Sequence, residues 1–560
     1  MLKPIEFREG QEETINIIKT ALQTNHVIIL DAPVGSGKSL INLLSVQGHR
    51  TYLTTPRTLL VDQYKNDIEE KFQGLGRVVK GKANYPCVHF EPHYENIFPN
   101  VNVSNAMCTW EKKDITPNAE KTWTCPDKYK CTYFVDKMRA QKADVAIITL
   151  DYFMLGINRI RLESPPDEDM DDYANMDGTR WERREILVVD EAHSLPETLT
   201  RFFSIEITKR TFGDFLDYNE MLDLERSLED KSIPPSEVIR DAFVAKLEEI
   251  SGEISKYIAD HPDETYNLPT YVSMRNKIVR YLRKLSLVDA DKWVFEVSKE
   301  DKSTKFIWTP LHVGEFMKET WDSFDNIIFS SATFISYSSF LHQLGLDGII
   351  PMIVKMPDTF PSSSAPIYIC TNLSISHKTK EQDLPILMRE IERLAAASEK
   401  YRGLIHCVSY ENQQYIMNNA SPSLTTRVVS HTSDNRNEQL DLYKKGYEND
   451  NSVFLSVNMT EGLDLPDDIC RWQIILKTPF RSMGSRWVKK RMELEDGQTW
   501  YETDALLQIM QASGRIMRSK DDWGVTYILD SNAARLVKKY GPSLPEWFLG
   551  RMSFYKSDVK

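Results

Sequence analysis

The turn APVGSGKS at residues 32–39 has the residue types that hold the phosphates of a nucleotide. It follows the apolar run VIIL at 27–30 and leads into the segment INLLSV at 41–46, an order that predicts a strand, a turn and a helix. Glycines let backbone N–H groups approach phosphate oxygens, Lys38 can neutralise phosphate charge, and Ser39 can ligate Mg²⁺. A glycine-rich turn that binds nothing is the alternative interpretation. The residues assigned to this site are Gly35, Ser36, Gly37, Lys38 and Ser39.

A pair of carboxylates follows another apolar run, in the segment ILVVDEAH at 186–193. Ligands of a parallel sheet lie at the carboxyl ends of its strands, so Asp190 is expected to hold Mg²⁺ there. Glu191 is expected to orient or deprotonate the attacking water, and His193 completes the predicted catalytic group. An Asp–Glu pair after a strand is often a helix cap instead. Together with the phosphate turn, however, the pair favours nucleotide hydrolysis.

A third motif, QIMQASGRIMRSKDD at 508–522, offers positive charge. Gln511, Arg515 and Arg518 are spaced to share one face of a helix. Gly514 within that helix costs about 1 kcal/mol relative to alanine, which indicates a close approach to another part of the molecule. The two arginines are candidates for stabilising the charge of a phosphoryl-transfer transition state. A solvated basic helix face is the alternative.

Four of the seven cysteines lie close together in the sequence. They are Cys87, Cys108, Cys125 and Cys131, separated by 20, 16 and 5 residues. Four thiolates can hold either zinc or an iron–sulfur cluster. Structural zinc usually shows paired CxxC motifs, which this spacing lacks, so a 4Fe–4S cluster is the favoured prediction. Zinc, unliganded thiols, and replacement of one cysteine by His89 or His93 are the alternatives.

Two series of short apolar runs must position these motifs. The first series lies at 27–30, 51–55, 145–149, 186–189 and 327–331, and the second at 367–370, 404–409, 427–430, 453–457, 474–477 and 525–529. Continuous apolar strands that alternate with helices are typical of parallel sheets covered on both faces. The expected fold class is therefore α/β, with two parallel-sheet domains.

Two segments interrupt the first series and are expected to be insertions. Residues 81–131 are rich in cysteine, aromatic residues, proline and asparagine, whereas 205–305 is mostly helical in pattern, as at 237–260. The acidic segment 163–178 is expected to be a solvated loop. The resulting division is first domain 1–80, cysteine-rich domain 81–131, first domain 132–204, helical domain 205–305, first domain 306–345, and second domain 346–560.

The bulk composition describes a globular protein of more than one domain. The chain has 560 residues, of which 41% are hydrophobic and 27% are charged. Its net charge, 69 − 82 = −13, argues against a basic coat but permits a local basic groove. No apolar run is long enough to span a bilayer, and the start MLKPIEFREG lacks a signal-peptide pattern. A cytoplasmic location, or a nuclear one in a eukaryote, is the expectation.

As a set, the segments DEAH, SSAT and QASGRIMR resemble the motifs of superfamily 2 helicases. The cysteine-bearing segment makes the chain similar to the iron–sulfur XPD/DinG group, which includes FANCJ-type helicases. The resemblance runs from about residue 5 to 535 and implies two RecA-like motor domains, a cluster domain and a helical arch. The departures are Ala32, Val34 and Ser39, and none of them threatens activity, because serine and threonine are interchangeable as Mg²⁺ ligands.

The resemblance also implies roles for further residues. FREGQ at 7–11 resembles the element that contacts adenine, TTPRTLL at 54–60 resembles a DNA-contacting motif, and SVNMTEGLDLP at 456–466 resembles a motif that meets nucleotide and DNA. The matching residues are Gln11, Arg57, Glu461, Gly462 and Asp464. Aromatic residues near the cysteines are candidates for stacking on bases, although packing around the cluster is the alternative for each. They are Tyr85, Phe90, Trp110 and Trp123.

The activity implied by the resemblance is that of an ATP-dependent DNA helicase that moves along single-stranded DNA, 5′ to 3′, and opens forked duplexes. ATP, Mg²⁺ and a 4Fe–4S cluster are the implied cofactors, the motor is expected to be monomeric, and DNA repair is among the roles left open. An ATPase that remodels RNA or protein–DNA complexes without unwinding is the alternative. A binding module with an inactive motor is disfavoured by the complete set of motif residues. No nuclease activity is expected, because neither end offers a segment long enough for an extra domain.

Overall fold

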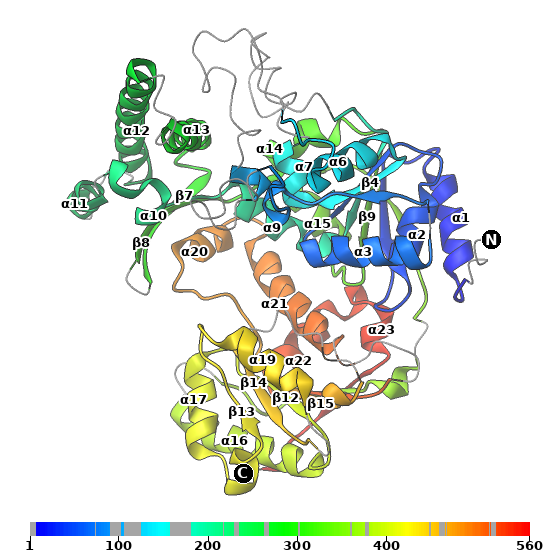
Figure 1. The fold of residues 1–560 in the computed structure, drawn as a ribbon. Helices are drawn as coiled ribbons and strands as arrows, with labels where there is room; N and C mark the ends of the chain where they lie inside the picture. Colours follow the sequence, from blue (N-terminus) through cyan, green and yellow to red (C-terminus); the bar gives the residue numbers. More distant parts are fainter. Residues whose placement is uncertain are drawn as a thin grey trace.

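The computed structural model describes residues 7–72, 74–89, 102–105, 125–156, 181–216, 218–228, 235–261, 268–300, 303–358, 361–375, 380–446, 450–457, 465, 467–514, 516 and 522–559. Its first sheet has seven parallel strands in the order β10-β1-β9-β5-β2-β4-β3 (Figure 1). The strands are β1 (Val27–Asp31), β2 (Thr51–Thr55), β3 (Arg77–Val78), β4 (Val145–Thr149), β5 (Ile186–Asp190), β9 (Asn326–Ser331) and β10 (Met352–Lys355).

Helices cover both faces of this sheet, because successive residues of one strand pack into different cores. In β1, Val27 and Ile29 belong to one buried cluster, whereas Ile28 and Leu30 belong to another. The helices of this domain are α1 (Gln11–Ala21), α2 (Lys38–Ser45), α3 (Thr58–Glu70), α6 (Thr132–Lys142), α7 (Leu150–Gly156), α9 (Leu195–Phe203), α14 (Gly314–Trp321) and α15 (Tyr337–Gln343).

The second sheet also has seven parallel strands, in the order β13-β14-β12-β15-β16-β11-β17. They are β11 (Ile367–Cys370), β12 (Gly403–His406), β13 (Val428–Val429), β14 (Val453–Ser456), β15 (Trp472–Ile475), β16 (Val525–Ile528) and β17 (Met552–Tyr555). The helices are α16 (Lys380–Ala397), α17 (Tyr410–Asn419), α18 (Pro422–Thr425), α19 (Arg436–Lys445), α20 (Arg486–Met492), α21 (Gly497–Ser513), α22 (Ser531–Tyr540) and α23 (Glu546–Leu549). The expected α/β class with two parallel-sheet domains is confirmed.

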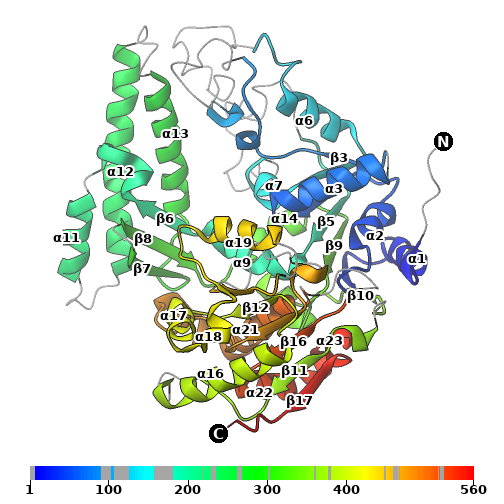
Figure 2. The same cartoon turned by 60° about the horizontal axis from the view of Figure 1, so that its bottom comes forward.

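A third unit connects β5 to β9 and lies to one side of the two sheets (Figures 1 and 2). It consists of α10 (Lys209–Phe212), α11 (Tyr218–Leu228), α12 (Pro235–Asp260), α13 (Leu268–Leu285) and the antiparallel sheet β6-β8-β7, formed by β6 (Ile205–Thr208), β7 (Trp293–Glu300) and β8 (Ser303–Pro310). The sequence indicated helices here but not this sheet. Its aromatic face packs on α12, with the Phe243 ring 5.1 Å from that of Phe306 and 5.7 Å from that of Trp308.

The strand pairing also bears on the expected domain boundaries. β10 pairs with β1, with Ile28 opposite Met352, so the first sheet continues beyond the expected boundary at residue 345. Likewise, β8 spans the expected boundary at residue 305. Among the described residues, no helix combines the length and apolar composition needed to cross a membrane.

Candidate functional site

The phosphate turn has the backbone shape that its glycines allow. Gly35 and Gly37 have φ angles of 77° and 79°, a left-handed conformation that glycine adopts without steric cost. A Cβ atom added at Gly37 would lie 2.3 Å from Gln11 Nε2, so a side chain does not fit there. Helix α2 begins at Lys38, and its N-terminal end therefore directs its positive dipole at the turn. The predicted strand, turn and helix are all present.

Gln11 braces this turn from α1. Its Nε2 donates to the carbonyl of Ser36 at 2.7 Å, and its Oε1 accepts from the backbone N–H of Arg8 at 2.7 Å. The side chain is buried against the turn, so both ends of its amide are held by the protein. The hydroxyl of Ser36 is also buried and has no hydrogen-bond partner within the described part of the chain. The adenine contact of Gln11 stays a prediction.

Lys38 and Glu191 form an ion pair within the site. Lys38 Nζ lies 3.8 Å from Glu191 Oε1, in an ion pair that is largely shielded from solvent. Glu191 has a φ of 50°, a left-handed conformation that is rare for a residue with a side chain. Ser194 donates its hydroxyl proton to the Glu191 carbonyl at 2.9 Å and helps to hold that turn. The predicted phosphate lysine and the predicted base therefore lie together.

Asp190 ends β5 and is buried beside this pair. Its Oδ1 accepts from the backbone N–H of Glu191 at 3.0 Å, and its Oδ2 accepts from the hydroxyl of Tyr64 at 3.0 Å. Burial and the charge of Glu191 raise the pKa of Asp190 to about 6, against the opposing effect of Lys38. A carboxylate has about four lone-pair sites, so oxygens remain to bind a cation. The donor set fits Mg²⁺, which prefers such hard oxygen ligands.

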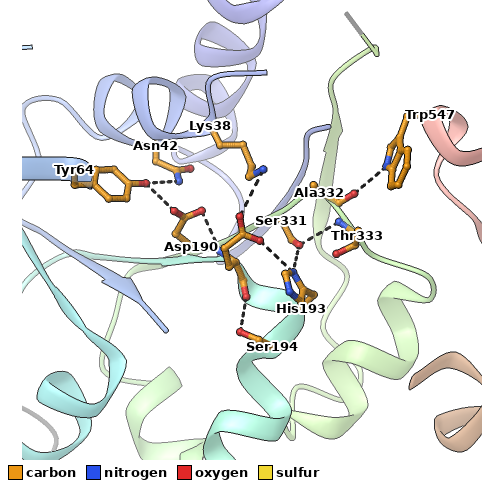
Figure 3. Close-up of polar contacts among 11 residues, drawn as sticks. Lys38, Asn42, Tyr64, Asp190, His193, Ser194, Ser331, Ala332, Thr333 and Trp547 are labelled. Atoms are coloured by element: carbon orange, nitrogen blue, oxygen red, sulfur yellow. Dashed lines mark hydrogen bonds and ion pairs between the residues drawn. The ribbon is translucent and has the colours of Figure 1, made fainter. Parts of the chain in front are cut away.

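His193 connects this group to the end of β9. Its Nδ1 is hydrogen bonded to Ser331 Oγ at 2.6 Å and lies 3.3 Å from Glu191 Oε2. Burial lowers the pKa of His193, so the ring is neutral near pH 7. Ser331 Oγ also accepts from the backbone N–H of Thr333 at 3.2 Å, and Trp547 Nε1 of the second domain donates to the Ala332 carbonyl at 3.1 Å. The SSAT segment thus contacts His193, which lies beside the predicted base, and also contacts the second domain (Figure 3).

A cavity of about 2720 Å³ separates the two parallel-sheet domains. Lys38, Asp190 and Glu191 line it from the first domain, and Gln511 of α21 lines it from the second. A Cβ atom added at Gly514 would lie 3.6 Å from Val34 Cγ2, so the end of α21 lies against the phosphate turn. Gly514 follows the last residue of α21, and a Cβ atom there would make an ordinary contact, so this approach does not itself require glycine.

Several predicted site residues lie outside the part of the chain that the structure describes. They are His93, Phe90, Cys108, Trp110, Trp123, Glu461, Gly462, Asp464, Arg515 and Arg518. Arg57 is described: it precedes α3 and lines the cavity. Its DNA contact and the roles of the undescribed arginines stay predictions.

Two contributors were not singled out from the sequence, Tyr64 and Trp547. The side chain of each residue bonds to a partner far away in the sequence. Tyr64 and Asp190 are 126 positions apart, and Trp547 and Ala332 are 215 positions apart. Tyr64 lies in a helix directly after a predicted motif, and Trp547 lies near the C-terminal strand. The local pattern gives neither residue a distinctive signal.

Helix α21, which carries Gln511, is anchored to α22 by a buried carboxylate. Glu502 accepts hydrogen bonds from Arg535 at 2.9 Å, Lys539 at 2.5 Å and Tyr540 at 2.8 Å. Burial alone would raise the pKa of Glu502, but these three donors outweigh it and lower the pKa to about 2. The network therefore fixes the helix that brings Gln511 to the cavity.

We expect Glu502→Gln to lower stability in a pH-dependent way. The pKa of Glu502 in the folded chain is below its ordinary value, so the ionised group stabilises the fold above about pH 4.5 and loses this effect as the pH falls towards 2. Because its cationic partners are half exposed, the expected loss at pH 7 is about 1–2 kcal/mol. Calorimetry should show a lower Tm at pH 7 and a shrinking difference in acid. Glu493→Gln, which removes an exposed pair with Lys490, is the control; an equal shift there would contradict the prediction.

Three of the four clustered cysteines are described, and they lie near one another. Burial raises the pKa of Cys125, and the nearby thiols of Cys87 and Cys131 add to the rise. His89 is hydrogen bonded through Nδ1 to Asp127 at 2.9 Å. Within the described ranges, no group of three or more His, Cys, Asp or Glu side chains is arranged to hold a metal ion. The fourth cysteine lies outside those ranges, so the cluster stays a prediction.

Tyr85 favours the packing interpretation. It is buried, its ring lies 5.5 Å from that of Tyr133, and its hydroxyl donates to Asp136 at 3.2 Å. A ring held on its edge and at its tip in this way has no free face of the kind that stacks on a base.

Known proteins are similar to this chain in sequence and in fold. Residues 391–550 match the model of the helicase C-terminal domain. The ATP-dependent DNA helicase YoaA of Haemophilus influenzae is 20% identical over 96% of this chain and 93% of its own length. The probable ATP-dependent helicase YpvA of Bacillus subtilis is 23% identical over 94% of this chain and 91% of its own. Among solved structures, an XPD helicase is 16% identical, covers 99% of this chain and 100% of its own, and has a TM-score of 0.62.

Proposed function

The chain belongs to the superfamily 2 helicases of XPD/DinG type, and we propose that it is an ATP-dependent DNA helicase. One observation carries the proposal: a single cavity is lined by Lys38, Asp190 and Glu191 from one parallel-sheet domain and by Gln511 from the other. A nucleotide bound in this cavity would contact both domains. Its binding and hydrolysis would close and open the cleft, which is the movement a motor needs.

In the proposed reaction Lys38 binds the terminal phosphates and Glu191 accepts the proton of the attacking water. Ser39 and Asp190 hold Mg²⁺, which supplies charge stabilisation at the transferred phosphoryl group. From the second domain, Gln511 faces the phosphates, and we assign the transition-state charge to Arg515 and Arg518. His193 would relay a change in the charge of Glu191 to Ser331, through the 2.6 Å hydrogen bond between His193 Nδ1 and Ser331 Oγ.

The proposed substrate is single-stranded DNA, entered from a forked duplex. We place Arg57 on its phosphates, because this residue lies at the cavity at the start of α3. A 5′ to 3′ direction, a monomeric motor and nucleotide contacts from Gln11, Gly462 and Asp464 complete the proposal on the basis of the family resemblance. The helical unit between β5 and β9 would be the arch beside the strand, and residues 81–131 the cluster domain.

Strand displacement tests the proposal directly. Purified protein with ATP and Mg²⁺ should open a fork that carries a 5′ single-stranded tail and leave a fork with only a 3′ tail closed. Opening of the 3′-tailed fork alone would overturn the direction. ATP hydrolysis that RNA stimulates, without opening of either duplex, would overturn the helicase and favour an ATPase that remodels RNA or protein–DNA complexes.

We propose that Cys87, Cys108, Cys125 and Cys131 hold a 4Fe–4S cluster. A tetranuclear cluster needs four cysteine ligands, and the sequence supplies four within residues 87–131. The wide, irregular spacing of the four cysteines suits a cluster better than zinc. A cluster here would tie residues 81–131 into a rigid unit beside the first domain.

Metal analysis of anaerobically purified protein should find about four irons and matching acid-labile sulfide per chain. Cys131→Ser should lose most of the iron and the visible absorption, because it removes one ligand. Cys470→Ser, which changes a buried thiol of the second domain, is the matched control and should keep both. Zinc in place of iron, or no metal, would contradict the cluster.

A further inference from the structure

The hydroxyl of Tyr64 contacts Asp190, one of the two residues assigned to Mg²⁺. Tyr64 lies on α3 with 1% of its surface exposed, and its ring points to the end of β5 (Figure 3). Its hydroxyl donates to Asp190 Oδ2 at 3.0 Å and accepts from Asn42 Nδ2 at 3.1 Å. One oxygen atom therefore connects Asp190 to α2, the helix that carries Ser39, the other expected ligand.

The donors and acceptors of these groups fix the direction of each bond. A phenol has one proton and can accept two hydrogen bonds, whereas an ionised carboxylate can only accept. The proton of Tyr64 therefore goes to Asp190, and the amide of Asn42 donates to the phenol oxygen. This arrangement fixes the rotation of the Asp190 carboxylate and ties the carboxylate to α2.

We infer that Tyr64 is a positioning residue that orients Asp190 as a ligand of the nucleotide-bound Mg²⁺. The inference rests on the proposed function, which places Mg²⁺ at Ser39 and Asp190. Groups behind the direct ligands of a metal typically change its affinity 10- to 100-fold when they are lost. A phenol that only filled space beside α2 would have no such effect, because phenylalanine keeps the ring.

The test compares nucleotide affinity with and without Mg²⁺. A fluorescent ADP analogue is titrated into wild type and Tyr64→Phe, once in EDTA and once in Mg²⁺. In EDTA the two proteins should bind alike, because the Tyr64 hydroxyl is hydrogen bonded to Asp190 and Asn42, and neither residue is assigned to the phosphates. In Mg²⁺ the gain in affinity should be about tenfold smaller for Tyr64→Phe. Electron paramagnetic resonance of Mn²⁺ bound with ADP should show the same loss.

Tyr52→Phe is the matched control. Tyr52 is equally buried in the first domain, and its hydroxyl donates to the Glu182 carbonyl at 2.6 Å, away from the site. It should keep the full gain from Mg²⁺. An unchanged gain in Tyr64→Phe, or an equal loss in Tyr52→Phe, would overturn the inference.

Asn42→Ala provides a second variant if Tyr64→Phe does not fold. It removes the donor that orients the Tyr64 hydroxyl and should reduce the gain from Mg²⁺ about threefold; no reduction would contradict the inference. Failure of the proposed function is distinguishable, because wild type would then show no gain from Mg²⁺ at all.

Discussion

Replacement of Glu191 by glutamine is expected to reduce kcat for ATP hydrolysis by about a thousandfold while ATP still binds. The change keeps the size and shape of the side chain but removes the group proposed to accept the proton of water. A positioned general base contributes about 10²- to 10⁴-fold to a rate. The glutamine carbonyl can still face Lys38, which lies 3.8 Å from the carboxylate, so the phosphate site should persist. Duplex opening should disappear together with hydrolysis.

Single-turnover hydrolysis and the affinity for a fluorescent ATP analogue, measured on the same preparation, check this prediction. Glu185→Gln serves as the control, since Glu185 belongs to the same domain and pairs with His49 on the surface. It should leave both quantities unchanged. A Glu191→Gln protein that turns over within about threefold of wild type would remove Glu191 as the base.

A series of contacts connects Glu191, the proposed base, to the second domain. Its carboxylate lies between Lys38, at 3.8 Å, and His193, at 3.3 Å. The next contact is Ser331, and Trp547 of the second domain holds the carbonyl of the following residue. Trp547, the Ser331–Ala332 segment and His193 therefore form a chain of contacts from the second domain to the proposed base. We expect this chain to couple hydrolysis to domain movement.

The elements of the site were largely predictable because their signals are local. A strand buried on both faces is a continuous apolar run, and such a run precedes both the phosphate turn and Asp190. The left-handed conformation at positions 35 and 37 favours glycine, so the two glycines predict the backbone conformation of the turn.

The features that the sequence did not predict depend on contacts between segments that are far apart along the chain. The partners of Tyr64 come from α2 and β5, and no periodicity within α3 distinguishes this residue from other core aromatics. The pairing of β10 with β1 joins residues more than 300 positions apart, which no linear boundary can express. Strands β7 and β8 were hidden because the long helices beside them dominate the pattern of that segment.

Loss of the ammonium in Lys38→Ala should impair nucleotide binding as well as hydrolysis, whereas loss of the base should impair hydrolysis alone. The variant should hydrolyse ATP at least about 100-fold more slowly and bind the fluorescent ADP analogue at least about tenfold more weakly, because charge-assisted hydrogen bonds to phosphate are strong in a shielded site. The same change leaves the half-buried Glu191 carboxylate without its cationic neighbour, which further disfavours an anionic ligand.

Together, the two variants separate binding from chemistry. Glu191→Gln should bind nucleotide and not cleave it, whereas Lys38→Ala should fail at both steps. Lys292→Ala, which removes a lysine paired with Glu315 on the surface, controls for the loss of a charge and should behave as wild type. Unchanged turnover in Lys38→Ala would exclude this cavity as the site of hydrolysis, and with it both the helicase and the remodelling ATPase.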